Sequence, residues 1–209
     1  MQLVVLATNE QKIELAVPTN DGVTWIEKED ELPDHSSADL VIDLTYSNTP
    51  QRNALLAQLH PATVVVNAVA DTLSEIDAAF VRINGWPTFL SAPVLEAACN
   101  NSEIRLKAEA GFKLLNRQLR WLPDEPGLVA ARVVSMIINE AFLALEEGVS
   151  TKEEINTAMK LGTAYPYGPF EWAAKIGLAN IAALLKKRSQ IQPHYAPSAL
   201  LVREAEKLT

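Results

Sequence analysis

The sequence predicts two domains of different class: an α/β domain over residues 1–123 and an all-α domain over residues 124–209. In the first part, short apolar runs alternate with capped helical segments, which is typical of βαβ units and a mainly parallel sheet. After Asp124, apolar residues recur only at helical spacing. With 48% hydrophobic and 21% charged residues, the 209-residue chain has the composition of a globular protein.

The expected strands of the first domain are short apolar runs that end at turn residues or helix caps. They cover residues 3–7, 23–27, 39–44, 63–69, 81–84, 95–99 and 120–122, and an Asn20-Asp21-Gly22 turn precedes the second. Between them we expect helices over 49–59, 72–79 and 102–116, and a surface loop or short helix over 27–34. Asn9 is expected to cap a helix that Pro18 ends, Asn48 or Thr49 to cap the second, and Ser102 the last.

A long helix opens the second domain, from Pro126 and Gly127 to about Glu147. Its apolar residues lie on nearly every side, so nearly every side must be buried. In a domain this small, part of that burial is expected to come from a second copy. The sequence therefore predicts a homodimer through the C-terminal helices.

The remaining helices have clear start and stop signals. Gly148 is expected to end the long helix in a left-handed conformation, and Ser150 with Glu153 forms a capping box for a helix that ends at Gly162. A third helix runs from Pro169 to Gly177. Further helices are expected over about 179–189 and 198–207.

Composition excludes several classes of function. The net charge of −8 and the absence of a basic stripe argue against nucleic acid as a partner. One cysteine, Cys99, and three histidines give no disulfide within the chain and no metal-site pattern. The start of the chain lacks the features of a signal peptide, and Arg132, Asn139 and Glu140 interrupt the most apolar helix. We expect a soluble cytoplasmic protein without a membrane segment or metal.

The turn after the first strand, residues 7–12, is where a dinucleotide-binding fold carries its glycine-rich loop. Here the turn contains no glycine, and Glu10 brings a negative charge to the place of a phosphate. Thr8, Asn9 and the following helix could hold a smaller ligand. The alternative is an ordinary strand-to-helix turn.

The helical part of the chain resembles the 3-hydroxyacyl-CoA dehydrogenase family. The matching residues, in order, are Pro126-Gly127, Arg132, Asn139-Glu140-Ala141, Glu147-Gly148-Val149, Lys152-Glu153, Ala158-Met159-Lys160-Leu161-Gly162, Tyr165-Pro166, Gly168-Pro169-Phe170-Glu171 and Ile176-Gly177-Leu178. A weaker resemblance extends to residues 39–43 (DLVID), Asn67, Glu75-Ile76 and Leu95-Glu96.

The resemblance implies a shortened Rossmann-like domain followed by the family's helical C-terminal domain, which dimerises and closes over an acyl-CoA. The family uses NAD to oxidise an L-3-hydroxyacyl-CoA to the 3-ketoacyl-CoA by hydride transfer. A histidine is its general base, a glutamate orients that histidine, and a serine and an asparagine hold the substrate oxygen.

Carried onto this sequence, the resemblance retains the glutamate as Glu96. The base histidine falls at Asn84, the serine at Val69 and the asparagine at Ala131. Asparagine cannot accept a proton at neutral pH, so Asn84 cannot replace the base.

Two further parts of the family's site are missing from the sequence. The acid that binds the ribose could only be Glu27 or Glu29. None of the three histidines is expected to supply the base, because His35 lies in an acidic surface stretch, His60 at a helix end and His194 in a loop.

Three hypotheses follow. The protein could be an active NAD-dependent 3-hydroxyacyl-CoA dehydrogenase. It could be a non-catalytic homologue that keeps the fold, the dimer and an acyl-CoA surface, which the missing catalytic residues favour. It could also be a different enzyme that uses Asp43, Asn67, Glu96 or Tyr165.

Overall fold

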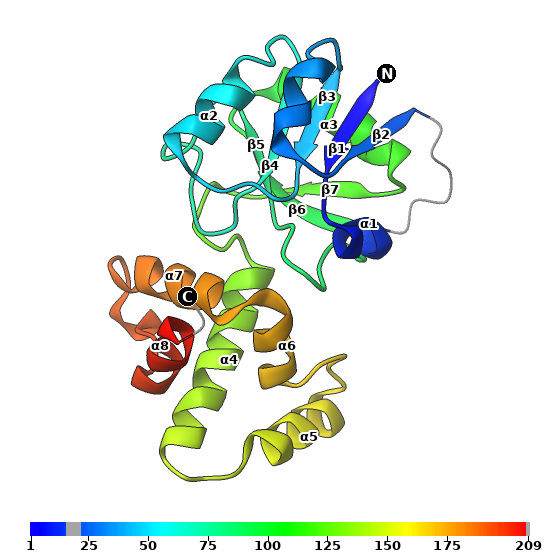
Figure 1. Cartoon of the computed structure of the whole chain (residues 1–209). Helices are drawn as coiled ribbons and strands as arrows, with labels where there is room; N and C mark the ends of the chain where they lie inside the picture. Colours follow the sequence, from blue (N-terminus) through cyan, green and yellow to red (C-terminus); the bar gives the residue numbers. More distant parts are fainter. Residues whose placement is uncertain (16–21, 208–209) are drawn as a thin grey trace. The chain divides into compact units, whose positions relative to one another are not determined.

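The computed structural model describes residues 1–15 and 22–207, which form two compact units, Met1–Leu128 and Val129–Thr209 (Figure 1). The expected boundary after residue 123 falls a few residues earlier. Residues 124–128 belong to the first unit because Asp124 and Glu125 hydrogen-bond to Arg82 of the sheet.

The first unit is built on a mostly parallel sheet, which confirms the predicted Rossmann-like class. In the described residues the sheet has seven strands, in the order β2-β1-β3-β4-β5-β6-β7. All neighbours are parallel except β5 and β6. The strands are β1 (Leu3–Leu6), β2 (Val23–Ile26), β3 (Leu40–Asp43), β4 (Thr63–Asn67), β5 (Val81–Ile83), β6 (Val94–Ala98) and β7 (Gln118–Trp121).

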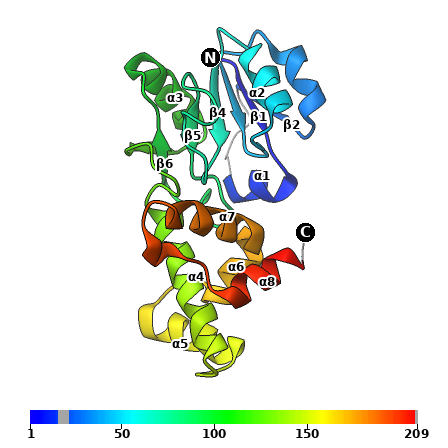
Figure 2. The ribbon, with the colours of Figure 1, turned by 90° about the vertical axis from the view of Figure 1, so that its left-hand side faces the viewer.

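Helices lie on both faces of this sheet. Figure 2 shows α3 (Ser102–Leu114) and α2 (Pro50–Ala57) on opposite sides of the strands. The short helix α1 (Asn9–Leu15) follows β1, and a 3-10 helix, η1 (Glu29–His35), follows β2.

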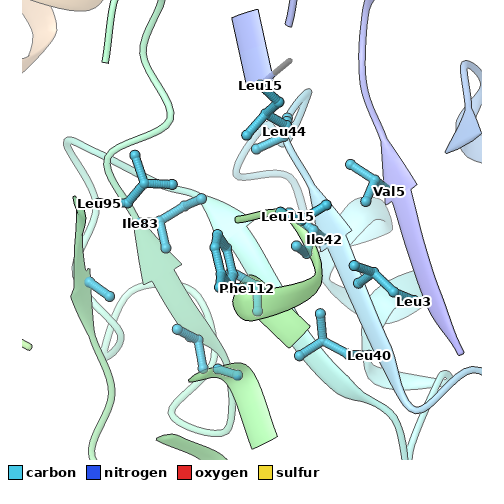
Figure 3. Close-up of a cluster of buried hydrophobic side chains, with 14 of the residues drawn as sticks. Leu3, Val5, Leu15, Leu40, Ile42, Leu44, Ile83, Leu95, Phe112 and Leu115 are labelled. Atoms are coloured by element: carbon cyan, nitrogen blue, oxygen red, sulfur yellow. The ribbon is translucent and has the colours of Figure 1, made fainter. Parts of the chain in front are cut away.

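The two faces alternate along each strand, as the pleat requires. Leu3, Val5, Leu40 and Ile42 point to one face, where they meet Phe112 of α3 in a closely packed cluster (Figure 3). The residues between them point to the other face, where Leu56 of α2 and Leu32 of η1 complete a second cluster. Burial of both faces accounts for the continuous apolar runs in the sequence.

One predicted helix is wrong: residues 72–79 are irregular. Thr72 and Glu75 form only a turn, in which the Thr72 N–H donates to the Glu75 carboxylate at 2.7 Å. The Leu73 N–H donates to the distant Asp124 at 2.9 Å, and the Asp77 carboxylate accepts from the Ala79 N–H at 2.8 Å. The first two of these N–H groups would have no partner within a helix, but the Ala79 N–H would donate to a carbonyl four residues earlier and instead donates to the Asp77 side chain.

Two caps of the first unit lie one residue earlier than predicted. Thr8, not Asn9, caps α1, since the Gln11 N–H donates to the Thr8 hydroxyl at 3.3 Å. Asn101, not Ser102, caps α3. Thr49 caps α2, one of the two residues expected there. The predicted stop at Pro18 and the Asn20-Asp21 part of the predicted turn lie outside the described residues.

The second unit is entirely helical, as predicted. It contains α4 (Ala130–Glu146), α5 (Lys152–Thr163), α6 (Pro169–Ile176), α7 (Leu178–Ser189), a 3-10 turn η2 (Pro193–Tyr195) and α8 (Ala199–Glu206). Helices α6, α7 and α8 all pack on α4. Buried Asn139 of α4 donates to the Ala196 carbonyl at 3.1 Å and accepts from the Ser198 N–H at 2.8 Å, which fixes the chain before α8.

The ends of these helices differ in part from the prediction. Helix α4 begins at Ala130 rather than near Pro126, because Gly127 and Leu128 have positive φ angles of 83° and 48°. Thr151 with Glu154, rather than Ser150 with Glu153, forms the capping box of α5.

The stop signals were only partly correct. Gly162 lies inside α5, which runs on to Thr163. Gly148 ends α4 with φ 70°, and Gly177 ends α6, as predicted. In the described part of the chain, no helix is both long and apolar enough to cross a membrane.

Candidate functional site

The order of the strands places the candidate site in the first unit. β1 lies between β2 and β3, so the chain leaves β1 toward one side and later returns on the other. In parallel sheets, ligands bind beyond the carboxyl ends of the strands at such a switch point. The relevant segments follow β1, β3, β4 and β5.

The turn after β1 is closed by its own side chains. The Thr8 N–H donates to the Gln11 side-chain oxygen at 2.9 Å, and the Gln11 N–H donates to the Thr8 hydroxyl. The Gln11 amide also donates to the Leu44 carbonyl, after β3, at 2.9 Å. Thr8 is thus engaged as a cap, whereas Asn9 is an exposed residue of the first helical turn. Hydrogen bonds from its own backbone N–H and from Thr8 lower the pKa of exposed Glu10, which therefore carries a negative charge.

A buried arginine connects the segments that follow β2 and β3. Arg52 of α2 is 4% exposed, and its Nε donates to Asp43, the last residue of β3, at 2.7 Å. Its Nη2 donates to the Thr45 hydroxyl at 3.2 Å, and its Nη1 pairs with Glu29. Burial raises the pKa of Asp43, while Arg52 and Thr45 oppose this by stabilising the ionised form.

This ion pair involves one of the two residues expected to bind a ribose. Of the two candidates, Glu29 is bound by Arg52, and Glu27 is exposed at the end of β2. The arginine was missed in the sequence, although a signal exists. Arg52, Leu56 and Leu59 have helical spacing, and all three are buried.

An asparagine joins the ends of the next strands. Asn67, at the end of β4, donates to the Leu44 carbonyl at 3.1 Å and accepts from the Gly85 N–H at 2.9 Å. A Cβ at Gly85 would lie 2.9 Å from the Asn67 Cγ, so this close approach requires glycine.

A tyrosine in the segment after β3 belongs to a second polar group. The Tyr46 hydroxyl donates to Asn53 at 2.6 Å, and the Asn53 amide donates to Asn48 at 3.0 Å. Burial, assisted by the charge of Asp71, raises the pKa of Tyr46 to about 12. Tyr46 is therefore a neutral hydrogen-bond donor, and sequence reasoning gave no signal for it.

The structure brings two predicted catalytic positions together. Asn84, which is 2% exposed, follows β5, and its N–H donates to the carbonyl of Glu96 on β6 at 3.0 Å. The Asn84 side-chain oxygen accepts from the Trp86 N–H at 3.4 Å. Val69, at the predicted serine position, is buried after β4, and its carbonyl accepts from the Gly127 N–H at 2.7 Å.

Other predicted residues belong to the second unit or to other strands. Ala131 and Tyr165 belong to the second unit, where Ala131 is buried in α4 and the Tyr165 ring lies 5.4 Å from the Trp172 ring. Asp43 and Glu96 are separated by strands β4 and β5, so their backbones lie about 14 Å apart and cannot form a carboxylate pair.

The three histidines belong to other segments than the groups described above. His35 ends η1, and the His194 ring lies 4.2 Å from the Tyr195 ring in the second unit. His60 lines a cavity of about 300 Å³ with Leu56, Val64 and Phe80, near the amino ends of β4 and β5. In the described residues, no group of three or more His, Cys, Asp or Glu side chains could hold a metal ion.

Comparison with known proteins identifies relatives over most of the chain. Residues 127–208 match the family described as 3-hydroxyacyl-CoA dehydrogenase, C-terminal domain. The chain is 32% identical over 191 residues to a 3-hydroxyadipyl-CoA dehydrogenase of Escherichia coli, covering 89% of the chain and 33% of that protein. It is 30% identical over 189 residues to a probable 3-hydroxybutyryl-CoA dehydrogenase of Deinococcus radiodurans, covering 82% of the chain and 67% of that protein.

Solved structures share the fold. FadB2 of M. tuberculosis matches with a TM-score of 0.75 and 17% identity, covering 99% of this chain and 93% of that one. The (S)-3-hydroxybutyryl-CoA dehydrogenase PaaH1 of Ralstonia eutropha matches with a TM-score of 0.72 and 20% identity, covering 97% and 92%. The chain thus spans a third of the length of the E. coli relative but nearly all of these two solved structures.

Proposed function

The chain belongs to the 3-hydroxyacyl-CoA dehydrogenase family, and we propose that it is a non-catalytic or catalytically impaired member that keeps the family's fold and dimer. The observation that carries the proposal is the turn after β1, which has no glycine and holds the charged Glu10. The proposed role is that of an acyl-CoA-binding or partner subunit in fatty-acid metabolism.

The first argument concerns the cofactor. A dinucleotide pyrophosphate needs glycines for close backbone approach and free N–H groups at a helix start. Here the Gln11 N–H is bound to Thr8, and the Gln11 amide is bound to the Leu44 carbonyl. Glu29 is paired with Arg52 rather than open to a ribose. These residues do not fit NAD.

The second argument concerns the chemistry. Asn84 stands at the position where the family has its base, and an amide has no proton affinity near neutral pH. Loss of a general base typically lowers a rate by about 10²- to 10⁴-fold. Glu96 lies beside Asn84, but there is no imidazole at that position for it to orient.

The proposed homodimer uses the second unit. Val129 and Val133, one turn apart at the start of α4, are 45% and 49% exposed. Leu161 of α5 is 83% exposed. Apolar side chains at such spacing form a surface that a second copy would cover.

A second candidate is an active NAD-dependent 3-hydroxyacyl-CoA dehydrogenase. It is favoured by the 30% identity over 189 residues to a protein named as a probable 3-hydroxybutyryl-CoA dehydrogenase. In that case a ligand would have to displace the bonds of the β1–α1 turn. Under both proposals the protein is cytoplasmic.

Thermal unfolding of the purified chain with NAD⁺ and, separately, with acetoacetyl-CoA distinguishes the candidates. We expect no stabilisation by NAD⁺ and stabilisation by the acyl-CoA. NADH formation from 3-hydroxybutyryl-CoA is measured in parallel, with the D. radiodurans relative as positive control. NADH formation by the wild-type chain that is lost in Glu96→Gln would refute the non-catalytic proposal. If neither ligand stabilises the protein, the acyl-CoA-binding role is refuted and only the partner-subunit role stands.

A further inference from the structure

A cavity in the first unit has no part in the site described so far. Its volume is about 300 Å³, at the lower end of the range of about 300–1,000 Å³ that is usual for small-molecule sites. The residues that give it its character are Leu56, His60, Val64, Asp77 and Phe80. Val64 is the second residue of β4, and Phe80 directly precedes β5. The cavity therefore lies at the amino ends of these strands, whereas the candidate site follows their carboxyl ends, and we call it the amino-end cavity.

The cavity is explained by the connection between β4 and β5. These strands are parallel neighbours, and a connection of this kind is usually a helix that covers the sheet. Here residues 68–80 are irregular throughout. Leu73 and Phe80 of this segment still pack in the cluster that Leu56 of α2 completes. An irregular segment fills the sheet face less completely than a helix does, so a space remains between it and the last turn of α2.

Part of the cavity wall is apolar and buried. Leu56, Val64 and Phe80 are 0%, 5% and 3% exposed, and all three belong to the cluster on this face of the sheet. An apolar group that enters the cavity is removed from water against these side chains, which is favourable. The wall therefore suits a small hydrocarbon or aromatic body.

One carboxylate supplies the charge of the cavity, because Asp77 is the only Asp, Glu, Lys or Arg among the residues that line it. Its Oδ1 accepts the Ala79 N–H at 2.8 Å, and its backbone carbonyl accepts the Phe80 N–H at 3.1 Å, so the residue is held in place. In the part of the chain that the structure describes, its Oδ2 accepts no hydrogen bond, and the imidazole of exposed His60 makes none. Both are available to a ligand.

We propose that the amino-end cavity binds a small organic cation, namely a primary amine with an apolar body. The body packs on Leu56, Val64 and Phe80. The ammonium donates to the Oδ2 of Asp77 and to the ring of His60. A charge-assisted hydrogen bond of this kind is stronger than a neutral one. Asp77 and the net charge of −8 disfavour an anion. The site uses no residue assigned to the cofactor or to catalysis, so it does not depend on the proposed function.

NMR of the backbone amides of the full chain, titrated with 2-phenylethylamine, tests the site. This amine is protonated at neutral pH, as the lysine side chain is. We expect it to shift the signals of Ala62, Ala79 and Phe80, but not those of Thr8 and Gln11 in the turn after β1. The uncharged 2-phenylethanol should bind about tenfold more weakly, and the anionic 3-phenylpropanoate should not bind. Equal affinity for the amine and the alcohol refutes the cation preference. The absence of shifts at the cavity refutes the site.

Two variants test the contact with the carboxylate. Asp77→Asn keeps an oxygen for the Ala79 N–H but removes the charge, so it should weaken amine binding about tenfold and leave alcohol binding unchanged. Glu75→Gln is the matched control, because Glu75 accepts the Thr72 N–H in the same segment but does not line the cavity. Its affinity for the amine should equal that of wild type. An equal loss in both variants would mean that the amine responds only to net charge, which refutes the contact. If Asp77→Asn does not fold, the comparison of amine with alcohol on the wild-type chain still decides.

Discussion

The N–H of Asn84 donates to the carbonyl of Glu96 at 3.0 Å, across the antiparallel pair of strands β5 and β6. The two positions to which the family resemblance assigns the base and the glutamate that orients it are therefore neighbours in this protein. If the assignment is right, Asn84 lacks the ionisable ring that the family has at this position. The positions can thus be tested separately from the cofactor site.

Replacing Asn84 by histidine tests whether activity is limited by the missing base or by the turn at which the cofactor would bind. We expect Asn84→His to produce no NADH from 3-hydroxybutyryl-CoA and NAD⁺ above background, because under the proposed function the β1–α1 turn does not accept the dinucleotide. Absorbance of NADH is the measurement, and Asn84→Ala is the control. Activity in the histidine variant that the alanine variant lacks would show that the cofactor still binds.

The ion network of Arg52 predicts two very different mutational effects. Arg52→Ala leaves Asp43, which is 0% exposed, as a buried charge without its main partner, so the free energy of unfolding should fall by about 3–5 kcal/mol. Glu29→Gln removes a partner that is 68% exposed, so the change should stay below about 1 kcal/mol. Urea unfolding of both variants measures the difference. Equal effects would mean that the pair at the surface, not the buried one, holds the segment.

Local signals in the sequence predicted most of the fold. The runs LVVLA and TVVVN are buried on both sheet faces, and Pro169 and Gly177 bound α6. The failures involve partners that are distant in sequence. Residues 72–79 contain a good capping pattern, but Asp124, about fifty positions away, binds the Leu73 N–H and fixes this segment in an irregular conformation.

The same reason limited the prediction of the site. The lack of a glycine after β1 could be read directly, and Asn84 could be placed beside Glu96 from the family pattern. The buried role of Arg52 depends on Asp43 and Glu29, which reach it only through the tertiary fold. A charged residue on the apolar side of a helix was the available signal.

Two glycines of the family's helical pattern predict opposite effects. A Cβ at Gly168 would lie 2.3 Å from the side-chain oxygen of Asn156, which accepts the Phe170 N–H, so Gly168→Ala should destabilise the protein by about 1–3 kcal/mol. Gly162 lies inside α5 with no atom near its Cβ position, so Gly162→Ala should stabilise by about 0.5–1 kcal/mol. Urea unfolding of the two variants gives both values. Destabilisation by Gly162→Ala would mean that α5 packs against another surface in solution.

A charge on the exposed side of α4 tests the proposed dimer. Val133→Glu places a carboxylate in the apolar surface that includes Val129, and we expect it to convert the dimer to a monomer. Size-exclusion chromatography with light scattering gives the mass of each form. Ala183→Glu, at an exposed position of α7 that the proposed surface does not include, is the control and should remain dimeric. A monomeric wild-type protein would refute the dimer itself.

The stability of the helical unit should depend on acid through Glu171. Lys160, whose ammonium lies 2.6 Å from this carboxylate, and the Gly168 N–H lower its pKa below the ordinary 4.5. Because the folded state favours the ionised form, the stabilisation is present above pH 4.5 and is lost as the pH falls through the lower folded-state pKa. Wild type should therefore exceed Glu171→Gln in unfolding free energy at neutral pH, and the difference should shrink in acid. Lys160→Gln, which removes the largest cause of the shift, should shift the loss of stability toward higher pH. A difference that stays constant in acid would mean that Glu171 stabilises α6 through hydrogen bonds that do not depend on its charge.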